Sequence, residues 1–107
     1  MFPKETSILI VDDMSTMRKL IKLQLIDLGY AAFYEAQNGA DALALLEKQA
    51  LLNNPVQLLL TYWNMPILTG IELLAEVRAN EKFKNIPFIL ITAEGEASQV
   101  AEANRLG

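Results

Sequence analysis

The sequence contains no cysteine and no histidine in its 107 residues. Their absence excludes disulfides, catalytic thiols, imidazole bases and the sulfur and nitrogen ligands on which most zinc sites depend. Any metal site must therefore be built from oxygen ligands. Apolar residues make up 52% of the chain, yet no uncharged apolar stretch approaches the length of about 18 residues that marks a transmembrane helix, so we expect no membrane span.

Basic residues are scarce relative to acidic ones. Nine Lys and Arg against 13 Asp and Glu give a formal net charge of −4. Nucleic-acid binding requires clustered cations that displace counterions from phosphates, so we predict no nucleic-acid partner. The first residues, Met1 to Thr6, lack the basic head and apolar middle of a signal peptide, so we expect a cytoplasmic protein.

Segments of strand and helix type alternate along the whole chain. Apolar runs predict strands over residues 7–11, 30–36, 56–61 and 87–92, of which the first and third are mainly apolar, as strands buried on both faces are. Helical spacing predicts helices over residues 15–28, 41–52, 71–78 and 97–106. Ser15 is the candidate N-cap of the first helix and Gly29 its stop.

Four β-α units in this order predict an α/β fold. Strands that alternate with helices form a doubly wound, mostly parallel sheet of the flavodoxin-like type, with helices on both faces. We expect one domain over residues 1–107. Ligands of such sheets bind beyond the carboxyl ends of the strands. Those ends carry Asp12 and Asp13, then Tyr62 to Asn64, then Thr92 to Glu94.

Three motifs at these strand ends resemble the receiver domains of bacterial two-component signalling, of the chemotaxis CheY type. They are Ile10-Val11-Asp12-Asp13, Trp63-Asn64-Met65-Pro66 and Ile91-Thr92-Ala93-Glu94. The resemblance covers residues 7–107 and implies a phosphorelay response regulator rather than an enzyme. Such a domain takes a phosphoryl group from a histidine kinase or a small donor, with Mg²⁺ at the site.

The resemblance also assigns roles to individual residues. It implies that Asp12 and Asp13 form an acidic metal pocket, that the Asn64 carbonyl is a further metal ligand, and that Thr92 is the switch residue that binds the phosphoryl oxygens. A simpler reading is that Asp12 and Asp13 only end a strand before a helix N-terminus, where negative charge is favourable. Thr92 could equally satisfy backbone groups at its strand end.

One departure from the family concerns the phosphoacceptor. The residue before Trp63 should be the accepting aspartate, but it is Tyr62, and no carboxylate occurs between Glu47 and Glu72. A phenol has a pKa of about 10, so it is neutral at pH 7, and its phosphate is a stable ester. We therefore expect a degenerate pseudo-receiver with weak or absent Mg²⁺ binding. The Tyr62 hydroxyl would donate to one of the two aspartates in place of the metal.

A second departure concerns the last unit of the fold. The resemblance implies a fifth strand, ending in a lysine, and a fifth helix, and the sequence through Gly107 has no counterpart of either. We therefore expect a receiver truncated at its C-terminus. Its strand-four edge and one side of the first helix would be uncovered, and bare edges recruit partners. The expectation is a homodimer or another self-association through these surfaces.

Two alternatives stay open at this point. One is a working receiver that is modified on another residue, for instance Thr61, Tyr62 or Thr92. The other is a flavodoxin-like cofactor binder with the same topology. It is disfavoured because a phosphate-binding first loop offers Gly, Ser or Thr amides, whereas Asp12 and Asp13 repel an anion.

Overall fold

A computed structural model describes residues 2–62 and 69–91. Four parallel strands form one sheet in the order β2-β1-β3-β4. The strands are β1 (Ser7–Val11), β2 (Ala32–Ala36), β3 (Leu58–Tyr62) and β4 (Phe88–Ile91). The helices are α1 (Ser15–Asp27), α2 (Gly39–Leu51) and α3 (Gly70–Ala79). The predicted doubly wound, flavodoxin-like sheet is thus confirmed, and the helix predicted over 97–106 lies outside the described residues.

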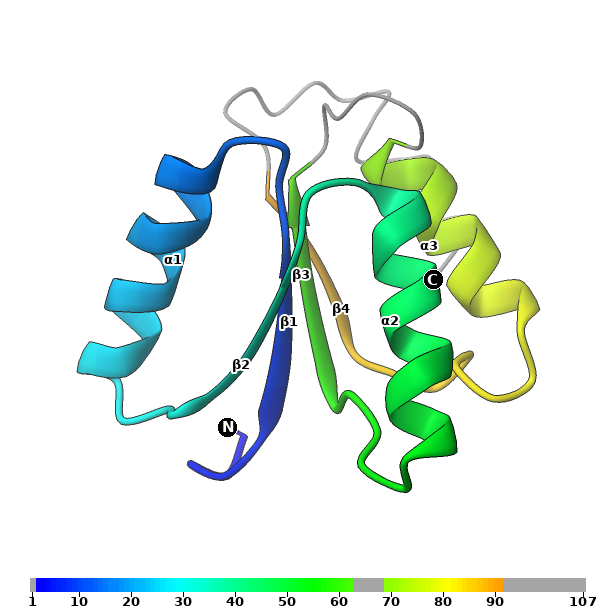
Figure 1. The fold of residues 1–107 in the computed structure, drawn as a ribbon, viewed down its shortest axis with the longest axis horizontal. Helices are drawn as coiled ribbons and strands as arrows, with labels where there is room; N and C mark the ends of the chain where they lie inside the picture. The colour runs from blue at the N-terminus through cyan, green and yellow to red at the C-terminus, as the bar shows by residue number, and fades with distance from the viewer. Residues whose placement is uncertain (1, 63–68, 92–107) are drawn as a thin grey trace.

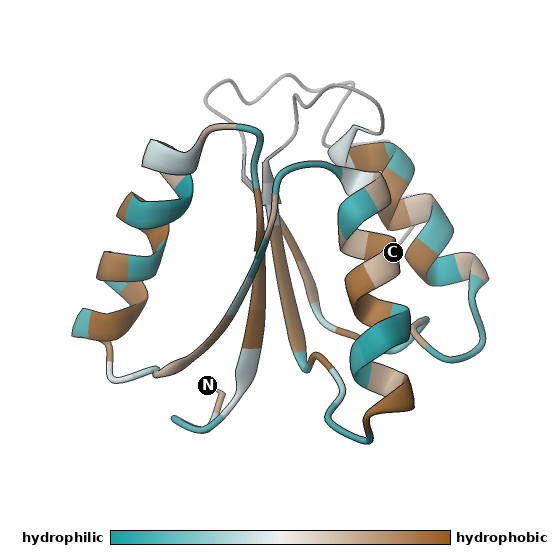
Figure 2. Cartoon of the chain, viewed as in Figure 1, coloured by the Kyte–Doolittle hydropathy of each residue, from teal (hydrophilic) through white to brown (hydrophobic). Residues whose placement is uncertain are grey.

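The helices divide unequally between the two faces of the sheet. Of the helices that the structure describes, Figure 1 shows α1 on one face and α2 with α3 on the other. Every residue of β1 is buried, as the continuously apolar sequence predicted, and Figure 2 shows β1 and β3 as mainly hydrophobic strands. Because side chains alternate along a strand, Leu9 and Leu59 pack toward α2 and α3. Ile8 and Ile10 pack toward α1. None of the helices in this part of the chain is long and apolar enough to cross a membrane.

The apolar side chains of α1 are only partly covered by the sheet. Ile21 and Leu25 pack against the sheet, but no residue of α1 is fully buried. Leu20 is 51% exposed, and Leu28 beyond the helix end is 61% exposed. The apolar face of α1 is therefore wider than the surface that this helix lays on the sheet.

Side-chain capping sets the starts of two helices but not of the first. The Asn38 side chain accepts from the Asp41 amide at 2.8 Å, so α2 begins at Gly39, two residues earlier than predicted. Thr69 and Glu72 form a capping box at the start of α3. The N-cap of α1 is Met14 and not Ser15, and it makes no side-chain cap bond. The amide of Met14 is instead turned toward the Asp12 carboxylate.

A residue from outside the helix caps the C-terminal end of α1. Gly29 adopts φ +102°, a conformation that favours glycine, and the predicted stop is confirmed. The Lys4 ammonium donates to the Leu28 carbonyl and lies 5.5 Å from the centre of the Tyr30 ring. The Tyr30 hydroxyl in turn donates to the Phe2 carbonyl at 3.1 Å. The segment before β1 therefore supplies the partner for an otherwise unpaired helix carbonyl.

Candidate functional site

The carboxyl ends of β1 and β3 meet at one edge of the sheet. Val11 pairs with Thr61 in the parallel register, so Asp12 and the backbone of Tyr62 each follow directly after a paired residue. The two positions therefore lie beside each other at the level of the backbone. Asn64 and Thr92 lie outside the described residues, as does the predicted hydrogen bond from the Tyr62 hydroxyl.

Asp12 is enclosed by main-chain groups. Its side chain is buried, with 2% of the residue exposed, and its Oδ1 accepts from the Met14 amide at 3.0 Å. Its own amide donates to the Ala36 carbonyl at 3.1 Å, and its carbonyl accepts from Arg18 Nη1 at 2.6 Å. Asp13, one residue on, is exposed. The two adjacent carboxylates therefore lie in opposite environments.

The buried position changes the acidity of Asp12. Burial raises the pKa of Asp12 above its ordinary value, because the charged form loses hydration. The hydrogen bond from the Met14 amide lowers this pKa, the hydrogen bond and charge of Asp13 raise it, and the charge of Arg18 lowers it. The net shift is upward. The folded state thus holds the Asp12 proton more tightly than the unfolded chain does.

Asp12→Asn is expected to stabilise the protein at pH 7. The raised pKa means that protonated Asp12 adds stability below its ordinary pKa, and that this contribution is lost as the pH rises through the folded-state value. Asparagine removes the cost of the buried charge and keeps an oxygen for the Met14 amide. We expect the free energy of unfolding at pH 7 to rise by about 1 kcal/mol. Urea denaturation from pH 3 to pH 8 measures it.

The control for this change is Asp27→Asn, at an exposed acidic residue of α1. It should leave the pH dependence of unfolding as in the parent chain. The gain in the Asp12→Asn variant should vanish at pH 3, where both folded and unfolded chains carry a neutral Asp12. A variant that is less stable than the parent at pH 7, or equally stabilised at pH 3 and pH 7, contradicts the account.

A cluster of charges beside Asp12 was not predicted. Arg18 Nε lies 3.0 Å from Glu35 Oε1, and Lys22 Nζ lies 3.9 Å from Glu35 Oε2. Neither cation has a role predicted from the sequence. The signal was present, however, because residues 18 and 22 are one helical turn apart and face the same side of α1. Arg18 thus joins the carbonyl of Asp12, just after β1, to the carboxylate of Glu35 on β2.

Two carboxylates, those of Asp12 and Asp13, follow β1 at the candidate site. Magnesium requires near-octahedral oxygen ligation, usually from one or two carboxylates with waters and substrate phosphate. Within residues 2–62 and 69–91, no three acidic side chains gather closely enough to hold a metal ion. Asp12 already accepts a backbone hydrogen bond, and Asp13 is turned to solvent. A metal ion at this site would therefore have to be held by two carboxylates, of which Asp12 is buried and Asp13 is exposed.

Thr61 bears on the alternative of modification at another residue. It lies in β3 and is fully buried, paired in register with Val11. A modifying enzyme would have to open the central strands of the sheet to reach its hydroxyl. Among the described positions, this burial disfavours Thr61 as an acceptor.

Comparison with known proteins agrees with this arrangement. The response regulator receiver domain family matches residues 8–107. Chemotaxis protein CheY of Pseudomonas aeruginosa is 46% identical over 100 residues, covering 94% of this chain and 77% of that protein. The structure of the chemotaxis response regulator CheY4 of Vibrio cholerae superposes with a TM-score of 0.82 at 28% identity, covering 96% of this chain and 81% of the other. The Mn²⁺-bound form of response regulator Rcp1 gives a TM-score of 0.81 at 28% identity, with 94% and 75% covered. The chain therefore belongs to the response regulator receiver domain family.

Proposed function

We propose that this receiver domain, of the two-component chemotaxis type, does not switch by aspartyl phosphorylation and acts instead by binding other proteins or a second copy of itself. The observation that carries the proposal is Tyr62 at the carboxyl end of β3, in register beside the end of β1 that carries Asp12. In receivers of this kind that strand end supplies the phosphoryl-accepting aspartate.

The chemistry of the side chain explains the loss of switching. A carboxylate at this position attacks phosphorus, ligates magnesium and forms a labile acyl phosphate that turns over. An ordinary tyrosine phenol has a pKa of about 10 and is therefore neutral at pH 7. Its phosphate would be a stable ester without the turnover that a reversible relay needs. Tyr62 thus provides none of these three functions.

Weak Mg²⁺ binding follows from the same substitution. The Mn²⁺-bound form of Rcp1 supports metal binding as a property of relatives. In this chain Asp12 and Asp13 are the remaining carboxylates at the site, one buried and one exposed. We infer that the metal is held weakly.

The protein partners are inferred from the surfaces of the domain. A histidine kinase could dock without transferring a phosphoryl group, as a partner of a receiver fold. Among the described strands β4 lies at the end of the sheet, and its Ile89 is 44% exposed. Ile89 pairs in register with Leu60 and so faces the side of the sheet that α1 covers. A second copy is proposed to pair with β4 and to cover this apolar surface together with Leu20 of α1.

Ile89→Lys is expected to weaken this self-association. A lysine at this exposed position of β4 would place a charge in the apolar contact with the second copy, where burying an unpaired charge is costly. Sedimentation velocity should show a dimer dissociation constant raised by about ten-fold or more. Leu51→Lys, at an exposed residue of α2, is the matched control and should leave the dimer unchanged. A parent chain that stays monomeric at all concentrations refutes the self-association.

Incubation with acetyl phosphate and Mg²⁺ tests the central proposal. Intact-mass spectrometry of the parent chain should show no added phosphoryl group that hydroxylamine removes. A hydroxylamine-resistant adduct would instead support the alternative of a receiver modified on a hydroxyl group. A hydroxylamine-labile adduct would refute the proposal, because only an acyl phosphate reacts in that way.

A further inference from the structure

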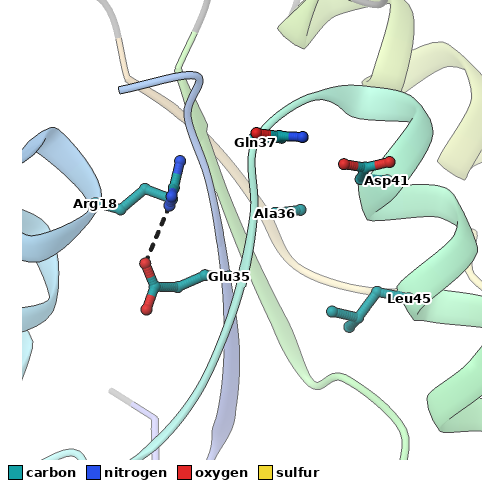
Figure 3. A pocket seen from close by; sticks show the side chains of 6 residues that line it. All are labelled: Arg18, Glu35, Ala36, Gln37, Asp41 and Leu45. Carbon is teal, nitrogen blue, oxygen red and sulfur yellow. Dashed lines mark hydrogen bonds and ion pairs between the residues drawn. The ribbon is translucent and has the colours of Figure 1, made fainter. Parts of the chain in front are cut away.

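A pocket of about 290 Å³ lies at the outer edge of β2, away from Tyr62. Figure 3 shows its side chains on both sides of the strand, with Arg18 and Glu35 toward α1 and Asp41 and Leu45 toward α2. Ala36 and Gln37 complete its lining. The pocket therefore straddles the edge strand and opens between two helices.

The main chain of β2 is available to a partner on this side. Among the described strands β2 pairs only with β1 and ends the sheet. The Ala36 carbonyl accepts from the Asp12 amide, so the main chain of Ala36 faces β1. Main-chain groups alternate in direction along a strand, so those of Phe33 and Glu35 face outward. An edge strand of this kind presents donors and acceptors to another extended chain.

The charges of the pocket favour a cationic side chain. The guanidinium of Arg18 and the carboxylate of Glu35 lie 3.0 Å apart and neutralise each other. The Asp41 carboxylate makes no hydrogen bond or ion pair with another residue in the described part of the chain, so it is the unpaired charge among the residues that line the pocket. Buried Ala36 and half-buried Leu45 give an apolar floor. An aliphatic stem over that floor with a cation at its end matches both features.

We infer that the β2 edge binds an extended peptide that adds a strand outside β2 and places a lysine or arginine side chain against Asp41. The backbone of the peptide would bond to the outward main chain of Phe33 and Glu35. Main-chain pairing gives the affinity, and the pocket selects the side chain. Tyr62 is not part of this site. A failure of the peptide to bind would therefore leave the proposal about phosphorylation untouched, and the reverse also holds.

The experiment uses two blocked heptapeptides, acetyl-Thr-Val-Thr-Lys-Thr-Val-Thr-amide and its counterpart with Glu in place of Lys. Each is titrated into the full chain and followed by amide NMR. The Lys peptide should shift the amides of Phe33, Glu35 and Gln37, and it should bind about ten-fold more tightly than the Glu peptide. Asp41→Asn should weaken the Lys peptide by about three- to five-fold, the effect of one exposed ion pair.

Two further variants make the result decisive. Asp27→Asn removes an exposed acid of α1 that does not line the pocket, and it should leave the affinity unchanged. Because Asp41 also lies in the first turn of α2, Gln37→Lys provides a second test outside the helix, by placing a cation at the pocket, and should weaken binding as well. Equal affinity for the two peptides, shifts centred away from β2, or no binding of either peptide would overturn the inference.

Discussion

Tyr62→Asp is expected to give a chain that acetyl phosphate and Mg²⁺ convert to a singly phosphorylated form, whereas the parent chain stays unmodified. The substitution places a carboxylate at the end of β3, beside the end of β1 that carries Asp12. That carboxylate supplies the nucleophile and a third acidic ligand for the metal. Intact-mass spectrometry should show the added phosphoryl group, and hydroxylamine should remove it.

Two controls separate the carboxylate from a general effect of a smaller side chain. Tyr62→Asn has nearly the shape of aspartate and should remain unmodified under the same conditions. Asp12→Asn combined with Tyr62→Asp should lose most of the phosphorylation, because the metal loses its buried carboxylate. Phosphorylation of the Tyr62→Asn variant, or none in Tyr62→Asp, would show that this strand end is not the site of the missing chemistry.

Gly29→Ala is expected to destabilise the domain by about 1–3 kcal/mol. Gly29 has φ +102°, which an L side chain rarely adopts, so alanine must shift the backbone at the end of α1. A Cβ at this position would also lie 2.9 Å from Lys4 Cδ and Nζ. The shift would move the ammonium away from the Leu28 carbonyl that it caps. Urea denaturation at pH 7 measures the loss.

A double-mutant cycle with Lys4→Ala separates the two causes. If the contact with Lys4 matters, Gly29→Ala should cost less in the Lys4→Ala background than in the parent chain. The remaining cost then belongs to the backbone conformation. Gln24→Ala, at an exposed position in the body of α1, should change the stability by less than about 0.5 kcal/mol. A Gly29→Ala variant as stable as the parent would contradict the positive φ at this residue.

The order of elements was predictable because it depends on patterns that a single strand or helix carries by itself. The apolar run over β1 requires burial on both faces, and all five of its residues are buried. Gly29 marks the end of the first helix by a conformation that few other residues adopt. The start of α1 was not predictable in this way. Ser15 is a good capping residue, but the Met14 amide is bound by Asp12, a contact set by the turn after β1.

The site was predictable in location and not in detail. The carboxyl end of a parallel strand is where such a fold presents its chemistry, and Asp12 lies there. Sequence alone does not separate Asp12 from Asp13, because both are carboxylates and their burial depends on how the chain turns into α1. The bridge from Arg18 to Glu35 needs the pairing of β1 with β2, a long-range fact that local patterns do not contain.

The shallow attachment of α1 has a consequence for the way the domain opens. Within the described residues α1 is attached by Ile21 and Leu25, with no side chain fully enclosed, whereas α2 and α3 each bury several residues. The stability of a fold is uneven, and its least enclosed element opens first. Detachment of α1 would release Arg18 from Glu35 and from the Asp12 carbonyl while the other layer stays closed. Local unfolding of α1 would therefore change the surroundings of Asp12 at the end of β1.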